Sequence, residues 1–420
     1  MKDGHGGTSI TEHQDLQRRT LRTLMAGLIP AGAAMTGAYS AAAVLGEELT
    51  GSELLGGLAA SGMTTGSALA ILPLARLMSA RGRRPGLLAG YLVSAAGAAT
   101  AMLAALTGWY ILLIPGMLGV GAGNAANLAA RYAAADLAPV EGRARAIGTL
   151  VWASTIGAVL GPSIGFGPAK SIAGAFGMPV LSGPYLLSTV LFLISALLVW
   201  RLLRPDPLVV AGGVGRSTTP ERRHLADAAR SLAGSATGRL AVLAMVVGHV
   251  VMVGVMTMTP LHLREGAHRL EIIGFVISLH IIGMYACAPV VGWLSDRIGP
   301  LPVLAAGGVI LFVGAEMAAV TRPEDSLGIF IGLFLIGLGW SFGLIASSAL
   351  LVSEFDGPER VRVQGLADLG MTASGALAGI GSGLLVTISD YPTLAHGSAL
   401  IGLFPTAAVL LMAARARRPR

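Results

Sequence analysis

Residues 240–299 read LAVLAMVVGHVVMVGVMTMTPLHLREGAHRLEIIGFVISLHIIGMYACAPVVGWLSDRIG, two long apolar segments joined by a short polar turn and closed by a glycine-bounded loop. Each segment carries thioether, imidazole or thiol side chains that a turn of about 100° per residue places on one helical face. They are Met245, His249, Met252 and Met256 in the first segment and His280, Met284 and Cys287 in the second. Soft and imidazole ligands therefore gather on one face of each of two consecutive helices.

The composition of the whole chain excludes an ordinary soluble protein. Of its 420 residues 54% are hydrophobic and 12% charged, and the mean hydropathy is +0.73. Twelve runs are long enough to cross a hydrocarbon core about 30 Å thick. The net charge of +7 comes from arginines between these runs, so we expect no nucleic-acid partner. The sequence predicts an all-α integral membrane protein embedded in a lipid bilayer.

The twelve predicted spans form two sets of six. They cover 23–45, 56–78, 86–107, 110–132, 146–166, 183–202, 239–259, 274–294, 302–320, 328–350, 366–388 and 397–414. The corresponding domains are a tail (1–22), a first six-helix bundle (23–202), a linker (203–238), a second bundle (239–414) and a short tail (415–420).

The arginines of the short loops predict the orientation. With the N-terminus inside, most of them lie on the inner side, which is the side that positive loops favour. Both tails are then cytoplasmic, in a multi-pass protein of the plasma (inner) membrane. The first apolar run is long enough to span, so we expect a retained helix and no cleaved signal peptide.

The linker at 203–238 changes character after the sixth span. Thr219 is a plausible N-cap before Pro220, and Leu225, Ala229 and Leu232 give the following segment an apolar edge. We expect a tether with a short helix on the inner membrane surface.

Two loops reveal an internal repeat. Gly299 lies 217 residues after Gly82, and Gly365 lies 217 residues after Gly148, in similarly basic loops. Six spans separate the members of each pair, so both halves enter the membrane in the same direction. The sequence predicts two parallel six-helix repeats.

The loop that closes the opening stretch resembles a motif of the major facilitator superfamily. The match consists of Gly292, Asp296, Arg297 and Gly299. In that superfamily, the loop locks the inner helix ends by binding its carboxylate to a helix N-terminus and to arginines. The first-half copy, around Gly82 and Arg83, departs from the pattern, because Ser79 replaces the aspartate. The resemblance implies the superfamily fold of twelve helices.

A narrower resemblance is to the CcoA-like (CalT) copper transporters. The paired motifs are Met252-x-x-x-Met256 and His280-x-x-x-Met284, and the segment Arg131-Tyr-Ala-Ala-Ala-Asp136 is also similar. The resemblance implies copper, or a small copper chelate, as an imported substrate held by these Met and His residues. The same family includes riboflavin importers, so the substrate stays open.

The chemistry of the stripes suits Cu(I), a soft ion that thioethers and imidazoles bind without adding buried charge. His249 and Cys287 are further candidate ligands. Three alternatives remain, since methionine is a common packing residue in apolar helices, and His280 could instead hydrogen-bond across the bundle or carry protons.

Other polar residues lie at membrane depth. Asn124, Asn127 and Arg131 are candidates for contact with substrate, and the alternative for the asparagines is hydrogen bonding between helices. Asp368 is a candidate for proton coupling, or for a simple pair with Arg362.

The sequence thus predicts a monomeric secondary transporter that works by alternating access, without a cofactor. Copper is one predicted substrate. The alternative is proton-coupled transport or efflux of an amphipathic organic solute such as a drug, metabolite or flavin. A membrane enzyme or sensor is not expected, because no Walker loop, HExxH pair or nucleophile elbow appears.

Overall fold

The computed structural model describes residues 10–215, 221–266 and 270–416, and these are helical apart from short turns and loops. Within these residues, twelve helical segments are long and apolar enough to span a membrane, as predicted. In chain order the helices are α1 (Ile10–Thr50), α2 (Glu53–Arg81), α3 (Arg83–Thr107), α4 (Tyr110–Ala133), η1 (Val140–Gly142), α5 (Arg143–Ile164), η2 (Gly165–Ala169), α6 (Lys170–Ala175), α7 (Ser182–Leu202), α8 (Pro207–Val210), α9 (Glu221–Gly234), α10 (Ala236–Glu265), α11 (Leu270–Tyr285), α12 (Ala288–Ile298), α13 (Pro300–Val320), α14 (Ser326–Glu354), α15 (Gly357–Ile388), α16 (Tyr391–Gly402) and α17 (Phe404–Ala416).

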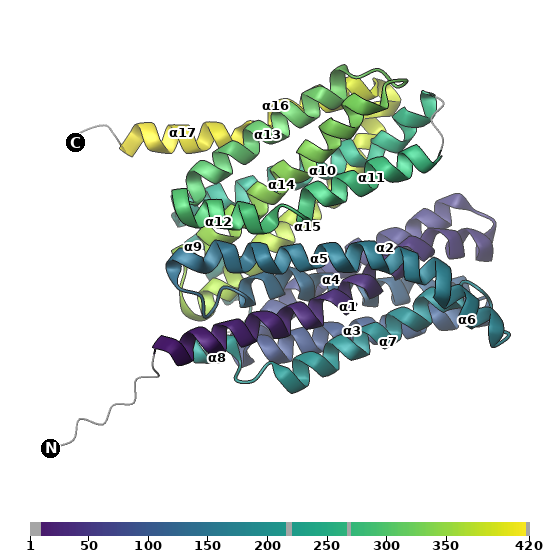
Figure 1. Cartoon of the computed structure of the whole chain (residues 1–420), viewed down its shortest axis with the longest axis horizontal. Coiled ribbons are helices and arrows are strands. Elements are labelled where there is room, and N and C mark those ends of the chain that lie inside the picture. The colour runs from purple at the N-terminus through teal and green to yellow at the C-terminus, as the bar shows by residue number, and fades with distance from the viewer. Residues whose placement is uncertain (1–9, 216–220, 267–269, 417–420) are drawn as a thin grey trace.

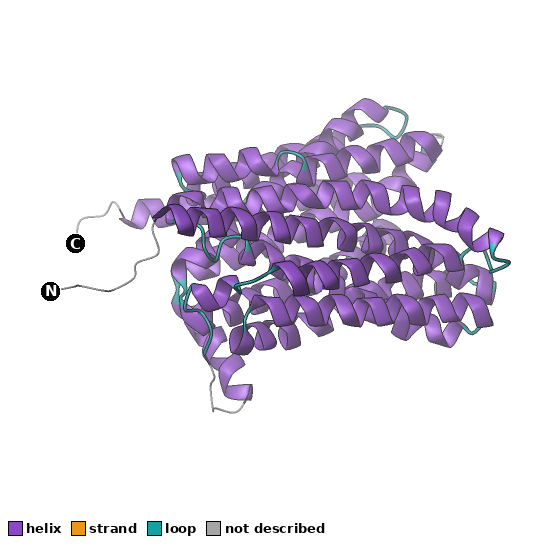
Figure 2. Cartoon of the chain, turned by 60° about the horizontal axis from the view of Figure 1, so that its bottom comes forward, coloured by secondary structure: helices purple, strands orange, loops and turns teal. Residues whose placement is uncertain are grey.

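The helices form two bundles, α1 to α7 and α10 to α17, that lie side by side (Figure 1). Each bundle has its own core of buried apolar side chains. Helix α1 begins and α17 ends at the same end of the molecule, as an even number of spans requires (Figure 2). We call this the terminus end.

Helix α1 is longer than the predicted span. It begins at Ile10, inside the segment 1–22 that was expected to be a tail, and residues 1–9 lie outside the described part of the chain. No glycine or proline interrupts residues 10–25. The Gln17 side chain also donates a hydrogen bond to the Ala134 carbonyl at 2.7 Å, which ties this extension to α4.

Two of the predicted spans are broken rather than continuous. The eighth changes from α11 to α12 at Ala286 and Cys287, just before Pro289, which lacks the N–H that a continuing helix would use. The last span breaks at Leu403, before Pro405. Cys287 therefore occupies the N-cap position of α12 and does not continue the helical stripe of His280 and Met284.

The linker contains two short helices at the terminus end. Asp206 caps α8, and α9 packs against α15 and α10. In the described part of α9, Leu225 and Leu232 are half-buried as the predicted apolar edge requires, whereas Ala229 is exposed and Ala228 is buried in its place. Thr219 lies outside the described residues.

Small residues let α5 lie directly on α1. A Cβ atom added to Gly157 would come within 2.8 Å of the Ile29 carbonyl, and one on Gly161 within 2.4 Å of the Ala33 carbonyl. Gly157 and Gly161, four residues apart, thus form a small-xxx-small contact, because only glycine permits this backbone approach.

Candidate functional site

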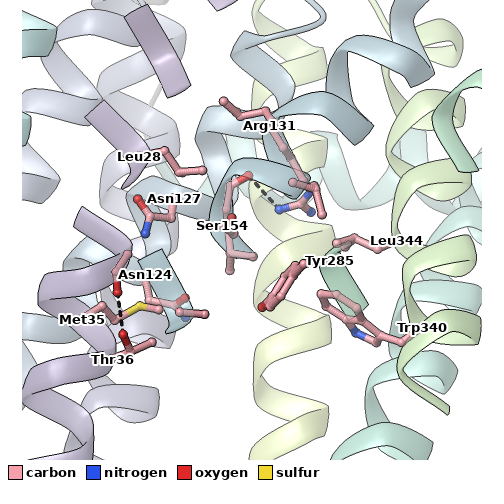
Figure 3. A pocket seen from close by; sticks show the side chains of 15 residues that line it. Leu28, Met35, Thr36, Asn124, Asn127, Arg131, Ser154, Tyr285, Trp340 and Leu344 are labelled. Carbon is pink, nitrogen blue, oxygen red and sulfur yellow. Dashed lines mark hydrogen bonds between the residues drawn. The ribbon is translucent and has the colours of Figure 1, made fainter. Parts of the chain in front are cut away.

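A cavity lies between the two bundles (Figure 3). Its empty volume is about 640 Å³, part of it open to solvent. The first bundle lines it with Thr36, Asn124, Asn127 and Ser154, and the second contributes Tyr285 and Trp340. Because α1, α4, α5, α11 and α14 all contribute, a molecule in this cavity would touch both halves of the protein.

The two asparagines line the cavity and are also held by neighbouring helices. The Asn124 amide donates to the Ser67 hydroxyl of α2 at 3.0 Å, and the Asn127 carbonyl oxygen accepts from the Tyr91 hydroxyl of α3, also at 3.0 Å. These bonds join helices, which is the predicted alternative, and they orient the amides at the cavity wall, so contact with substrate stays a prediction.

Two aromatic side chains form the opposite wall. The rings of Tyr285 and Trp340 meet edge to face, with centroids 5.9 Å apart. The Trp340 indole N–H donates to Nδ1 of His249 at 3.1 Å, which fixes the orientation of the indole. The close approach of Gly375 confines His249 in turn, because a Cβ there would lie 2.3 Å from the imidazole Cδ2.

Arg131 also lines the cavity, and it joins the two halves of the protein. Its guanidinium forms a buried ion pair with Asp368 of α15 and donates to the Ser348 hydroxyl of α14 at 3.0 Å. The Tyr132 hydroxyl donates to the same carboxylate at 3.3 Å. Asp368 is 3% exposed, and its buried carboxylate is paired with an arginine of the other half.

A second charged layer lies closer to the terminus end. Asp136 accepts hydrogen bonds from Arg83 at 2.8 Å and from Arg360 at 3.3 Å, and Arg83 also donates to the Gln364 side chain at 2.9 Å. Arg83 and Asp136 belong to the first half, and Arg360 and Gln364 to the second. The layer is buried, and its ion pairs and hydrogen bonds join the two halves.

The predicted lock loop forms a third connection. Asp296 accepts from the backbone N–H groups of Ala144 and Arg145, both at 3.0 Å, at the N-terminus of α5. Beside it, a Cβ on Gly292 would lie 2.5 Å from the Ala144 carbonyl. The structure thus shows the predicted contact of this carboxylate with a helix N-terminus. Arg297 instead lies over the Trp293 ring.

The first-half copy of this loop shares the backbone conformation of the second copy but lacks its carboxylate contact. Gly82 and Gly299 both have a positive φ, of 103° and 91°, which explains the glycines at equivalent positions of the repeat. Ser79, where the second copy has Asp296, bonds within its own helix to the Arg76 carbonyl. Arg83 lies in the buried layer around Asp136, so it joins the halves through a different carboxylate.

Replacing Asp296 by alanine should remove both hydrogen bonds to α5. A carboxylate at a helix N-terminus contributes about 1–2 kcal/mol, so we expect a lower midpoint of thermal unfolding in detergent. Asp227→Ala, in the exposed pair with Arg230, is the matched control. Equal midpoints for the two variants would show that the contact of Asp296 with α5 does not stabilise the protein.

The methionine and histidine stripes do not face the cavity. His280 is fully buried, and its Nδ1 lies 2.8 Å from the Leu333 carbonyl of α14. Met252 and Met284 belong to the core of the second bundle. None of Met252, Met256, His280 and Met284 is among the described residues that line the cavity. Both histidines bond to α14, which is the hydrogen-bonding alternative considered above.

In the described part of the chain, no group of three or more His, Cys, Asp or Glu side chains could hold a metal ion. Cys287 is partly exposed at the break between α11 and α12. Whether the methionines bind a metal stays a prediction.

Sequence reasoning missed several residues of this site. Trp340, Tyr285 and Thr36 are ordinary residues for a membrane helix, and no local pattern marks them as cavity residues. One signal was available, because Ser348 lies 217 residues after Arg131. The two side chains that bond across the centre therefore occupy equivalent positions of the repeat.

Comparison with known proteins agrees with this architecture. The model of the Major Facilitator Superfamily matches residues 24–269 and 268–420. The chain belongs to the Major Facilitator Superfamily. YdeG, an MFS-type transporter of Bacillus subtilis (strain 168), is 34% identical over 94% of this chain and 92% of its own length. Membership makes the chain a membrane transporter, as predicted.

More distant relatives and solved structures extend the comparison. The riboflavin transporter RfnT of Brucella anthropi is 27% identical over 80% of this chain and 81% of its own length. The human organic anion transporter MFSD10 (TETRAN) has a TM-score of 0.74 at 15% identity, covering 94% of this chain and 99% of that one. A bacterial homologue of ferroportin in an outward-facing state has a TM-score of 0.73 at 14% identity, covering 94% and 100%. At these identities the structures show a shared fold.

Proposed function

We propose that this superfamily member imports a planar aromatic organic solute, with riboflavin as the first candidate. The observation that carries the proposal is the cavity, in which aromatic rings from one half face amide and hydroxyl groups from the other. A solute bound there would be released when the halves rock about it, which is how alternating access works in this architecture.

The cavity walls suit a flat, polar-edged molecule. Tyr285 and Trp340 offer ring faces and edges for stacking, which adds to the free energy of apolar burial. Asn124 and Asn127 offer amide donors and acceptors to the edge of such a ring. An isoalloxazine ring combines an extended aromatic face with a hydrogen-bonding edge, and the riboflavin transporter among the relatives supports this class of solute.

The structure favours this proposal over copper. Met252 and Met284 lie in the core of the second bundle and His280 bonds to α14, while the solvent-connected cavity has a different lining. Copper transport would require the Met and His side chains, so their replacement by residues of similar size separates the two hypotheses.

Uptake into cells tests the proposal. In a riboflavin auxotroph lacking its own importer, the wild-type protein should raise accumulation of labelled riboflavin and leave the copper content unchanged. Trp340→Ala should reduce uptake at least tenfold, because it removes an aromatic wall. The control is Trp109→Ala, since Trp109 is 65% exposed outside the cavity.

Two outcomes would contradict the proposal. One is copper accumulation that requires Met252 and His280 together with no uptake of any aromatic solute. The other is riboflavin uptake that Trp340→Ala leaves intact.

We also propose that Asp368 carries the coupling proton and that the terminus end faces the cytoplasm across the plasma membrane. The buried pair of Arg131 and Asp368 supports the first point, since an ionisable pair inside a membrane protein commonly marks a proton or substrate path. The arginine-rich loops support the second.

A further inference from the structure

A second hollow lies on the outside of the first bundle, at the terminus end of α2, α3 and α7. It has an empty volume of about 1160 Å³, including open solvent. We call it the arginine pocket and define it by Arg81, Arg84, Arg204, Trp200, Leu88 and Asp206. It shares no lining residue with the central cavity.

The charge of this pocket is strongly positive. Asp206, the carboxylate among the described lining residues, accepts hydrogen bonds from four backbone N–H groups, those of Arg83, Arg84, Leu208 and Val209. It therefore balances two helix N-termini rather than the arginine side chains. Among the described residues, no carboxylate forms an ion pair with Arg81 or Arg204.

Two arginine side chains lie beside one aromatic ring, and a third bonds to the backbone of the same residue. The guanidinium of Arg204 lies 5.9 Å from the centre of the Trp200 ring, and that of neighbouring Arg201 lies 4.7 Å from it. Arg84 donates two hydrogen bonds to the Trp200 carbonyl, at 3.1 and 2.9 Å. These contacts hold positive charges beside a tryptophan at the end of a membrane span, where tryptophan lies at headgroup level.

An apolar surface leads away from the pocket along the same two helices. Leu88 lines the pocket, and Leu92, one turn farther along α3, is 46% exposed. On α7, Leu197 and Leu193 are 52% and 47% exposed. Helices α3 and α7 pack against each other, so these side chains form one lipid-facing surface that starts at the arginines.

We propose that the arginine pocket binds the phosphate headgroup of an anionic phospholipid, with its acyl chains along α3 and α7. Arginine suits phosphate because its planar fork donates several hydrogen bonds to the oxygens. A positive pocket at headgroup depth, continuous with an apolar track, matches both parts of such a lipid. Free phosphate would satisfy only the first part.

Native mass spectrometry of the purified protein tests this directly. With phosphatidylglycerol and phosphatidylcholine supplied in equal amounts, we expect the wild type to retain phosphatidylglycerol about tenfold better. In Arg81→Gln/Arg204→Gln the preference should disappear. The control, Arg19→Gln/Arg230→Gln, removes the same charge from exposed positions at the same end and should keep it.

A second measurement does not depend on the double variant. Phosphatidylglycerol with brominated chains should quench tryptophan fluorescence more than brominated phosphatidylcholine does, and Trp200→Phe should abolish the difference. Equal retention of both lipids by the wild type, or equal loss of preference in the control, would overturn the proposal. Thermal stabilisation by inorganic phosphate as large as that by phosphatidylglycerol would overturn the assignment to a lipid.

Discussion

Replacement of Asp136 by asparagine is expected to destabilise the protein by about 3–5 kcal/mol, the usual cost of removing one partner from a buried ionic network. The carboxylate is fully buried and separates Arg83 from Arg360. Without its charge, two guanidinium groups from opposite halves would repel each other in a buried contact. We expect a midpoint of thermal unfolding several degrees lower and easier separation of the halves at the terminus end.

Asp227→Asn is the control for that experiment. It also removes a carboxylate that pairs with an arginine, but its side chain is 50% exposed, and exposed pairs contribute about 0–1 kcal/mol. If Asp136→Asn unfolds at the same temperature as Asp227→Asn, the layer around Asp136 does not hold the halves together.

The second large effect concerns Asp368. Asparagine mimics the protonated acid and cannot release a proton, so Asp368→Asn should lose at least tenfold in pH-gradient-driven uptake. Exchange of labelled for unlabelled solute needs no net proton movement, and it should continue. Both activities can be measured in the same proteoliposomes with an imposed pH gradient.

Ser348→Ala provides the comparison for this variant. It removes another hydrogen bond to Arg131 but no titratable group, so uptake should still respond to the gradient. Full gradient-driven accumulation by Asp368→Asn would contradict the proposed proton coupling.

The sequence was sufficient to predict the spans and the repeat because these depend on local properties. Apolar length is local, and the glycines of the two loops mark positive φ values at Gly82 and Gly299. Helix interruptions were less apparent, although Pro289 and Pro405 lie just after the two breaks. Helix α1 extends beyond the predicted span because a polar segment can continue the helix that crosses the membrane, and α1 begins well before that span.

The candidate site was harder to predict, because its contacts join residues far apart in the chain. Helical periodicity gave the stripe of His280 and Met284, but it could not show that His280 faces α14. Arg131 and Asp368 were both singled out, yet their pairing depends on the contact between two bundles. The predicted alternative, a pair of Asp368 with Arg362, would join two residues of one helix, whereas Arg131 belongs to the other half.

The central claim is that an aromatic solute binds between the halves, and direct binding of riboflavin to purified protein tests it best. Flavin fluorescence should give saturable binding to the wild type, at least tenfold weaker binding to Trp340→Ala, and unchanged binding to Trp109→Ala and to Met252→Leu. No saturable binding of riboflavin or any related aromatic solute, or affinity that follows Met252 rather than Trp340, would contradict the account.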